Sequence, residues 1–453
     1  MTTEVVILAA GKGTRMRSKL PKVLHQLAGK PMVGHVIDTA KKIQAGAIHV
    51  VIGHGAEQVQ QNFADADLHW AIQSEQLGTG HAVAQAMPAV KADSIVLIAY
   101  GDVPLVTAET LSALVDAANE NTLSLLTVYL DNPTGYGRIV RESGVITAIV
   151  EQKDASEEQL LINEVNTGIL AVSAAKLNQW LPALSSNNAQ GEYYLTDIIA
   201  MAVKDGMTVT AQHPQSAMEV EGANNRLQVA GLERFYQQQQ AERLMTEGAT
   251  LADPARIDIR GDLTIGQDIF IDVNCVFIGD VTIADDVTIG PNCVIENSTI
   301  GKGTVIKANS ILENATVAEN CDVGPFARLR PGSVLADKAK VGNFVETKKA
   351  NIGEGSKVNH LTYIGDSNIG KGVNIGAGTI TCNYDGVNKS TTNIGDGAFI
   401  GSNSSLVAPV NIGSNATVGA GSTISSDIAD NQLGVARGKQ KNLDSWKRPT
   451  KKS

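Results

Sequence analysis

The sequence predicts two kinds of domain in one chain. We expect an α/β domain with a mostly parallel, Rossmann-like sheet at residues 1–225, a long linker helix at 226–249, and an all-β left-handed parallel β-helix of hexapeptide repeats at 250–453. Three observations predict this. Apolar strands alternate with helical segments in the first half. An apolar residue recurs at every sixth position in the second half. The stretch between them keeps helical spacing without a proline.

The first half contains three apolar runs with strand character, "EVVILAA", "AIHVVIG" and "SIVLIAYGDVP". Segments with helical spacing lie between and after them, namely "HVIDTAKKI", "GHAVAQAM" and "AETLSALVDAANE". This alternation favours a mostly parallel sheet covered by helices on both faces. In such sheets ligands bind at the carboxyl ends of the strands, so the loops after these runs are the candidate site.

The second half shows a six-residue period that starts at Ile257 and continues to Val341. Every residue of this series is aliphatic or cysteine except Thr299, and the series also assigns Val305 and Ile311 to the interior. Gly, Asn and Asp between these positions tolerate tight turns. Such a period predicts triangular coils of roughly eighteen residues, stacked about 4.8 Å apart. The segment "TCNYDGVNKSTTN" (381–393) breaks the period and is expected to loop out.

The composition limits the classes of function. A length of 453 residues favours two or three domains. The net charge of −10 argues against a nucleic-acid surface. No apolar run is long enough to cross a membrane and the N-terminus does not resemble a signal peptide, so we expect a cytoplasmic protein. None of the four cysteines forms a CxxC pair. Cys275 and Cys293 fall on the repeat and are expected to be buried, whereas Cys382 does not.

A glycine-rich loop, "LAAGKGTRMRSKLPKVL", follows the first strand. It is not a P-loop, and Met16 stands where a dinucleotide-binding motif would have its last glycine. Exposed backbone N–H groups together with cationic side chains suit a polyphosphate. The alternative is an ordinary tight turn with solvated cations. The cations of this loop are Lys12, Arg15, Lys19 and Lys22.

Two oxygen-bearing side chains are candidate magnesium ligands. Asp102 follows the strongly apolar strand in "YGDVPL", at its carboxyl end, and Asn224 lies in "EGANNR" at the start of the predicted linker helix. Magnesium is usually held by one or two protein oxygens, with phosphates and waters completing its shell. The alternatives are a turn residue for Asp102 and a helix cap for Asn224.

The β-helix half carries a second group of candidate residues. Its interior is filled by aliphatic side chains, so a site must lie on an outer face or between neighbouring copies. Arg328 and Arg330 are two residues apart and should share one face. Lys348, Lys349, Tyr363, Asn374, Asn383 and Tyr384 follow along the chain.

His360 is the only histidine beyond residue 220. Imidazole titrates near neutral pH and could accept a proton from an attacking amine. The alternative is a surface histidine paired with a carboxylate such as Glu346. Because His360 is two residues from the inward Val358, a role as base requires a corner between them that turns the imidazole outward.

Several motifs together resemble one family. "LAAGKGTRMRSKLPKVLHQLAGKPM", "EQLGTGHAV" and "YGDVPL", combined with "NHLTYIGD" and "TCNYDG" in the hexapeptide half, resemble bifunctional bacterial N-acetylglucosamine-1-phosphate uridylyltransferase/glucosamine-1-phosphate N-acetyltransferases from end to end. The resemblance implies acetyl transfer from acetyl-CoA to glucosamine-1-phosphate, then uridylyl transfer from UTP with release of pyrophosphate. The product would be UDP-N-acetylglucosamine, a precursor of the bacterial cell envelope. It also implies a homotrimer.

The same resemblance implies roles for residues of the first half. Arg15 and Lys22 would be catalytic and hold the triphosphate, while Asp102 and Asn224 would bind Mg²⁺. Residues implied to bind UTP or UDP-N-acetylglucosamine are Leu8, Ala9, Ala10, Gly11, Lys22, Gln73, Gly78, Thr79, Tyr100, Gly101, Asp102, Gly137, Glu151, Asn166 and Asn224.

In the second half the resemblance implies that His360 is the general base and that the Ala377 N–H faces the oxyanion. Cys382 leaves an acyl-thioester route as an alternative. The implied sugar-phosphate residues are Arg330, Lys348, Tyr363 and Asn374. The implied acetyl-CoA residues are Ala377, Asn383, Tyr384, Ser402, Ala420 and Arg437.

Two competing hypotheses stay open at this stage. The chain could be a single sugar-1-phosphate nucleotidyltransferase whose β-helix serves oligomerisation or regulation, or a non-catalytic scaffold. The basic tail "RGKQKNLDSWKRPTKKS" could be a solvated terminus or could supply cations to the CoA phosphates across a subunit boundary.

Overall fold

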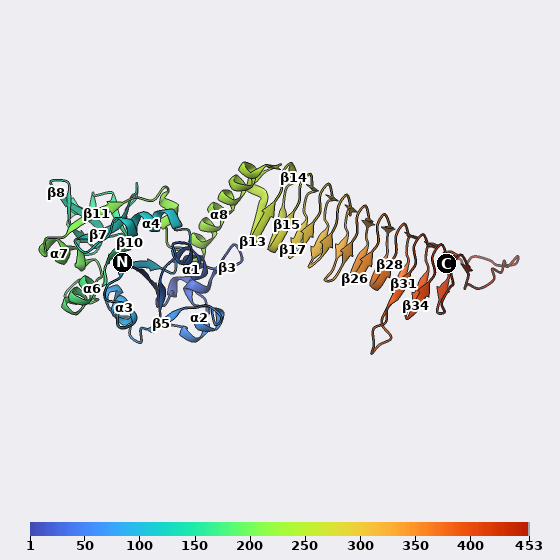
Figure 1. Ribbon diagram of the computed structural model, residues 1–453, viewed down its shortest axis with the longest axis horizontal. Coiled ribbons are helices and arrows are strands. Elements are labelled where there is room, and N and C mark those ends of the chain that lie inside the picture. Colours follow the sequence, from blue (N-terminus) through green and yellow to red (C-terminus); the bar gives the residue numbers. More distant parts are fainter. Residues whose placement is uncertain (452–453) are drawn as a thin grey trace. The chain divides into compact units, whose positions relative to one another are not determined.

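The computed structural model describes residues 1–451, which form two compact units that divide between Tyr236 and Gln237 (Figure 1). The predicted linker helix is present as α8 (Arg226–Glu247), and the division between the units falls inside it. Lys452 and Ser453 of the basic tail lie outside the described residues.

The first unit is built on a nine-stranded sheet with the order β11-β7-β10-β6-β1-β4-β5, extended by the β8–β9 hairpin. β1 pairs in parallel with β4 and β6, whereas β10 is antiparallel to both of its neighbours on this path, so the predicted mostly parallel sheet is confirmed. The strands are β1 Thr3–Ala9, β4 Ala47–Ile52, β5 His69–Ile72, β6 Ile95–Tyr100, β7 Thr122–Tyr129, β8 Arg138–Glu142, β9 Val145–Val150, β10 Glu164–Ser173 and β11 Thr208–Gln212. A separate two-stranded sheet pairs β2 Gln26–Leu27 with β3 Lys30–Pro31.

Helices cover both faces of this sheet. Val5 and Ile7 of β1 pack into one apolar cluster, and Val6 and Leu8 pack into another, as expected for a central strand buried on both sides. The three helical segments predicted from the sequence are present as α1, α3 and α4. The helices of the first unit are α1 Met32–Lys42, α2 Ala56–Asn62, α3 Thr79–Ala86, α4 Ala108–Asp116, α5 Glu157–Leu160, α6 Ala174–Trp180 and α7 Asp197–Lys204.

The second unit is a parallel β-helix whose coils contribute to two long sheets (Figure 1). The 11-stranded sheet contains β12 Ala249–Leu251, β14 Ile269–Ile271, β16 Thr288–Ile289, β19 Val305–Ile306, β22 Asp322–Val323, β25 Lys340–Asn343, β27 Lys357–His360, β29 Asn374–Ile375, β32 Phe399–Ile400, β35 Thr417–Val418 and β37 Leu433–Gly434. The 15-stranded sheet contains β13 Ile257–Ile265, β15 Cys275–Ile283, β17 Val294–Glu296, β18 Thr299–Ile300, β20 Ile311–Glu313, β21 Thr316–Val317, β23 Arg328–Leu329, β24 Val334–Leu335, β26 Glu346–Ile352, β28 Tyr363–Ile369, β30 Ile380–Cys382, β31 Thr392–Ile394, β33 Ser405–Val407, β34 Val410–Ile412 and β36 Thr423–Ile424.

The predicted six-residue phase is correct over most of the β-helix and wrong in one stretch. Thr299 and Ile311 are exposed, whereas their neighbours Ile300 and Leu312 are fully buried. Val305 is likewise only half-buried, whereas its neighbour Ile306 is fully buried. The cause is a shortened leg, since each leg buries two residues two apart, and Cys293 and Ile295 are followed by Ser298 and Ile300, five residues on. After a second five-residue step, from Leu312 to Val317, the predicted series coincides with the second buried residue of each leg. Cys275 and Cys293 are buried free thiols, as predicted, and Cys382 is half-buried.

One corner of the β-helix carries the features that matter for function, and we call it the site corner. It follows the strands of the 11-stranded sheet, and its apex residue has a left-handed backbone in each successive coil. Most of these apex residues are asparagine or glycine, which adopt this conformation readily. The apex residues are Asn274, Asn292, Asn309, Phe326, Phe344, Leu361, Gly378, Asn403 and Gly421.

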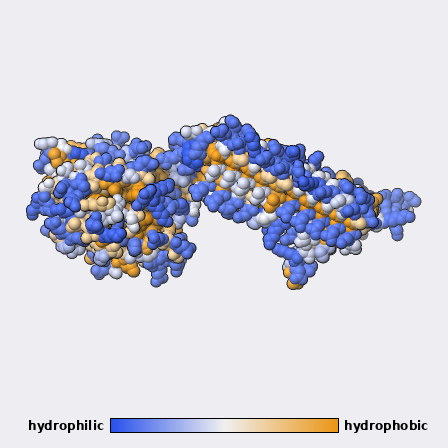
Figure 2. All heavy atoms as spheres, viewed as in Figure 1, coloured by the Kyte–Doolittle hydropathy of each residue, from blue (hydrophilic) through white to orange (hydrophobic). Residues whose placement is uncertain are grey.

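The loop predicted at 381–393 projects from the β-helix (Figure 1). It is a short hairpin in which Tyr384 and Lys389 form an antiparallel bridge and the Ser390 N–H donates to the Asn383 carbonyl at 2.9 Å. Its tip is apolar (Figure 2), and Val387 is 84% exposed. Within the described residues, no helix combines the length and apolar character needed to cross a membrane.

The burial pattern predicts unequal effects of two neighbouring substitutions on β20. Leu312→Ala should lower the free energy of unfolding by about 2–5 kcal/mol, because it opens a cavity in a fully buried position. Ile311→Ala should cost less than about 1 kcal/mol, because that side chain is 38% exposed. Urea unfolding followed by circular dichroism measures both, and equal losses would contradict the corrected register.

Candidate active sites

The first unit contains a cavity of about 300 Å³ at the carboxyl ends of β1 and β6. Ten of the residues implied by the resemblance line it. They are Leu8, Ala9, Ala10, Gly11, Lys22, Gln73, Gly78, Thr79, Tyr100 and Asp102. The prediction that the loops after the apolar strands form a pocket is thus supported by the geometry.

A chain of polar contacts joins the glycine loop, the turn after β6 and the segment just before α8. The Lys22 ammonium forms an ion pair with Asp102 Oδ2 and donates to Asn224 Oδ1 at 3.1 Å. Arg15 Nη2 also donates to Asn224 Oδ1, at 2.9 Å. The two predicted metal ligands therefore face the same cation, so their oxygens converge on one position. Among the described residues, no cluster of three or more His, Cys, Asp or Glu could hold a metal ion.

Local backbone structure explains why these groups meet. Gly13 has a left-handed backbone, and a Cβ there would lie 2.7 Å from Lys22 Cβ, so only glycine lets the loop lie against Lys22. The Asp102 carbonyl accepts from the Ala223 N–H at 3.0 Å, which places Asn224 beside β6.

A second group of implied residues lies around Tyr100. The Asn166 N–H donates to the Gly137 carbonyl at 2.9 Å. A Cβ at Gly137 would lie only 2.9 Å from Ile149 Cγ2, so glycine lets this backbone pack against Ile149 beside the Glu151 carboxylate. Burial raises the pKa of Glu151, although a hydrogen bond from Thr196 opposes the shift. This carboxyl therefore keeps a proton to higher pH than a solvated one and suits hydrogen bonding to a sugar hydroxyl.

In the β-helix, three of the implied acetyl-CoA residues lie along the site corner. Ala377, Ser402 and Ala420 each precede an apex residue in three successive coils, in the same position as His360. Within the described residues their N–H groups donate to no protein acceptor. Arg437 Nη1 donates to the Ala420 carbonyl at 2.7 Å. The result is a row of backbone donors with an arginine at its end.

His360 is exposed, although Val358 two residues earlier is fully buried, so the imidazole points out of the prism as its predicted role requires. The left-handed apex residue is Leu361, directly after His360 rather than before it. His360 Nδ1 lies 2.7 Å from Asn343 Oδ1. The alternative pairing with Glu346 is wrong, because Glu346 accepts from Arg330 at 2.7 Å.

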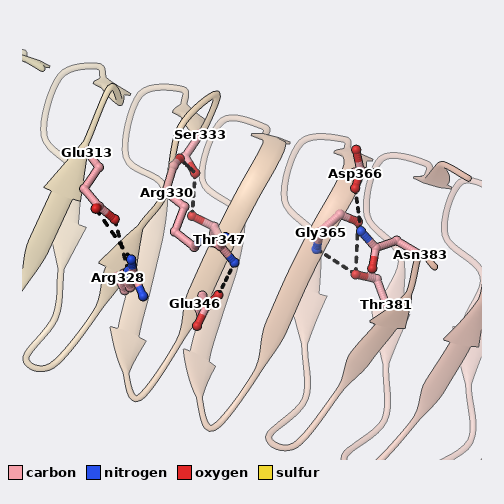
Figure 3. Close-up of polar contacts among 10 residues, drawn as sticks. All are labelled: Glu313, Arg328, Arg330, Ser333, Glu346, Thr347, Gly365, Asp366, Thr381 and Asn383. Carbon is pink, nitrogen blue, oxygen red and sulfur yellow. Dashed lines mark hydrogen bonds and ion pairs between the residues drawn. The ribbon is translucent and has the colours of Figure 1, made fainter. Parts of the chain in front are cut away.

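Figure 3 shows the implied sugar-phosphate face, on the outer side of the 15-stranded sheet. Arg328 and Arg330 share this face, as predicted, and pair with Glu313 and Glu346 respectively. Lys348 lies beside them in the next coil. The neighbouring Lys389 ammonium, with a smaller contribution from Arg330, lowers the pKa of Lys348. Crowded cations of this kind favour a bound anion such as a phosphate.

The projecting hairpin is anchored beside this face. Asn383 donates its side-chain amide to the Asp366 carboxylate (Figure 3). Tyr384 is 59% exposed at the hairpin base, and Lys389 lies near Lys348. Asn374 is on the other side of the corner, in β29 of the 11-stranded sheet.

Sequence reasoning missed several residues of these sites. Gln76 and Glu192 line the cavity of the first unit. Gln76 lies inside the quoted "EQLGTGHAV" motif, which could have suggested it. Lys389 is the only cation of the loop 381–393. Asn343 carries no signal in the sequence, since its position beside His360 depends on the coil register.

Gly168 should be required for the position of Tyr100. A Cβ at Gly168 would lie 2.5 Å from Tyr100 Cε2, so Gly168→Ala should displace the ring and lower the affinity for UDP-N-acetylglucosamine by ~10-fold or more, measured by calorimetry. Gly144→Ala is the matched control, because Gly144 has a similar left-handed backbone with nothing within 4 Å of its Cβ. Similar losses in both variants would refute the steric argument.

Comparisons with known proteins find relatives for both units of the chain. Residues 5–161 match a MobA-like NTP transferase domain, 259–346 match a GMPPB C-terminal domain, and 391–426 match six repeats of the bacterial transferase hexapeptide. The bifunctional protein GlmU of Marinobacter nauticus is 64% identical over 448 residues, covering 99% of both chains. The same protein of Cellvibrio japonicus is 62% identical, covering 99% of this chain and 100% of its own. That of Stutzerimonas stutzeri is 61% identical over the full length of both. The chain therefore belongs to the family of the bifunctional protein GlmU, and the resemblance drawn from its motifs is confirmed.

Proposed function

We propose an assignment of the two reactions to the two sites. The chain is a bifunctional enzyme of UDP-N-acetylglucosamine synthesis, which transfers an acetyl group to glucosamine-1-phosphate and a uridylyl group to N-acetylglucosamine-1-phosphate. The cavity of the first unit carries out uridylyl transfer, and the site corner of the β-helix carries out acetyl transfer. The observation that carries this assignment is the outward His360 beside a row of backbone donors and a cluster of cations.

In uridylyl transfer, a phosphate oxygen of the sugar phosphate attacks the α-phosphorus of UTP, and the bond to the pyrophosphate oxygen breaks. The nucleophile is already ionised at neutral pH, so no general base is needed. Positioning and neutralisation of charge supply most of the rate. Lys22 and Arg15 both donate to Asn224 Oδ1, and we assign these two cations to the triphosphate and the leaving pyrophosphate.

Asp102 and Asn224 fit a magnesium ion. Their oxygens both contact the Lys22 ammonium, which supports a position suited to a cation. With only two protein oxygens, a magnesium ion would take its other ligands from phosphate and water, as is usual for this metal. When bound, it would neutralise charge on the phosphates. Lys22 would then turn toward the triphosphate.

In acetyl transfer, the amine nitrogen of glucosamine-1-phosphate attacks the thioester carbonyl of acetyl-CoA. His360 accepts the proton that the amine loses, the C–S bond breaks, and the CoA thiolate leaves and takes up a proton. The Ala377 N–H donates to the oxyanion. Ser402, Ala420 and Arg437 continue the donor row along the pantetheine and phosphates. Direct transfer needs no thiol, so Cys382 has no role in it.

We propose that the acetyl site is completed by a second copy in a homotrimer. Lys348 and Tyr363 lie on the 15-stranded sheet and Asn374 lies on the 11-stranded sheet, so the site corner separates them. The two sheets form different outer faces of one copy, which favours a site whose residues come from two copies. An apolar stripe along the β-helix (Figure 2) is also typical of a surface that another chain covers. The substrates UTP and acetyl-CoA favour a cytoplasmic location.

Separate inactivation tests the assignment of reactions. His360→Ala should lower acetyl transfer by roughly 10²–10⁴-fold and leave uridylyl transfer unchanged. Asp102→Ala should lower uridylyl transfer by on the order of 10²-fold and spare acetyl transfer. Each half-reaction is assayed alone on the full chain. Loss of both activities from either change, in a protein that stays folded, would refute two independent sites.

Mixed oligomers test the shared site. Lys348→Ala and Asn374→Ala should each impair acetyl transfer when expressed alone. Mixed assemblies of the two variants should recover activity, up to about a quarter of wild type under random mixing, because some sites then combine two intact faces. The absence of recovery in mixtures whose heteromeric state is verified by mass spectrometry would overturn the shared site.

A further inference from the structure

Asn343 occupies the same position in its coil as His360 does in the next. β25 and β27 are parallel, and their register pairs Asn343 with His360 directly. The two side chains meet across the coil spacing, with Asn343 Oδ1 at 2.7 Å from His360 Nδ1. Both residues immediately precede a left-handed apex, Phe344 in one coil and Leu361 in the other. The same corner geometry therefore directs both side chains outward.

The β-helix contains an independent example of this kind of contact. Asn351, Asn368, Asn393 and Asn411 stack in register on another face, and each carboxamide donates to the next at 2.8–2.9 Å. Stacked side chains one coil apart thus form hydrogen bonds of ordinary length. At the site corner the same interaction joins a carboxamide to an imidazole.

The hydrogen bond determines the tautomer of the imidazole. A carboxamide oxygen can only accept, so the proton between the two side chains belongs to His360 Nδ1. In the neutral ring the lone pair then lies on Nε2, on the side of the ring that faces away from Asn343. We propose that Asn343 is a positioning residue for acetyl transfer, which holds His360 in the Nδ1–H tautomer and presents Nε2 to the substrate amine.

The surroundings of the pair are compatible with this role. Asn343 and His360 line a groove of about 460 Å³ together with the cationic side chains Lys340 and Lys357. Lys307 also lines it but is paired with Asp322 at 2.6 Å. Among the described residues, Asn343 is the side chain that is hydrogen-bonded to the His360 ring, and no carboxylate is bonded to it.

The inference rests on the proposed role of His360 as base, and the experiment separates the two. Asn343→Ala in the full-length enzyme should lower kcat for acetyl transfer by ~10-fold or more, with little change in KM for acetyl-CoA. Asn343→Asp retains an acceptor and should recover much of kcat, but its added negative charge should move the acidic limb of the pH profile to higher pH. Uridylyl transfer should stay at the wild-type level in both.

Asn351→Ala is the matched control, because it removes a stacked carboxamide bond in the same coil away from the site corner. It should leave acetyl transfer unchanged. Wild-type kcat and pH profile in Asn343→Ala, while His360→Ala is inactive, would overturn the positioning role alone. An active His360→Ala would instead refute the base assignment.

Nitrogen NMR of the histidine side chains gives a second readout that a merely structural role would not move. In the wild type the His360 ring should show a protonated Nδ1 and an unprotonated Nε2 at high pH. In Asn343→Ala the population should shift toward the Nε2–H tautomer, and in Asn351→Ala it should not. A wild-type ring in the Nε2–H form would contradict the proposal.

Discussion

The in-register stacking of coils is the constraint on which the acetyl site depends. Parallel pairing places residues that are about one coil apart in the chain next to each other. Functional side chains therefore line up in columns across successive coils instead of lying close together in the sequence. His360 and Asn343 are 17 residues apart and form a hydrogen bond. Asn383 reaches Asp366 over the same separation. A column has a fixed spacing, and the groups on it are positioned by backbone pairing before any substrate arrives.

In the α/β unit, the ends of neighbouring strands, instead of stacked coils, position the residues of the site. The carboxyl ends of β1 and β6 meet at one edge of the sheet, so the pairing of these strands brings the glycine loop and Asp102 together. Asn224 is the exception, because it comes from a distant part of the chain. The hydrogen bond from Ala223 to the Asp102 carbonyl joins it to this edge. This backbone contact, together with the hydrogen bonds from Arg15 and Lys22, places the proposed second oxygen ligand in the site.

The sequence was informative where a pattern repeats or where a motif follows a strand. It predicted the sheet, the linker helix, the β-helix and most of the cavity lining. It failed at Thr299, because a five-residue leg leaves two adjacent β-branched residues, Thr299 and Ile300, and only packing decides which one is buried. It also missed Lys389 and Asn343. Their roles depend on a hairpin conformation and on a coil register, which no local pattern encodes.

The apex residues of the site corner are not all of the types that adopt a left-handed backbone readily. Six coils use asparagine or glycine there, yet the three coils around His360 use Phe326, Phe344 and Leu361. A left-handed backbone costs each of them about 1–2 kcal/mol. Their side chains are also exposed, by 49%, 56% and 63% respectively. Stacking of the two phenylalanine rings at 5.2 Å offsets only part of this cost. Strain and apolar exposure therefore coincide beside the proposed base, where a second copy would cover the side chains and complete the site.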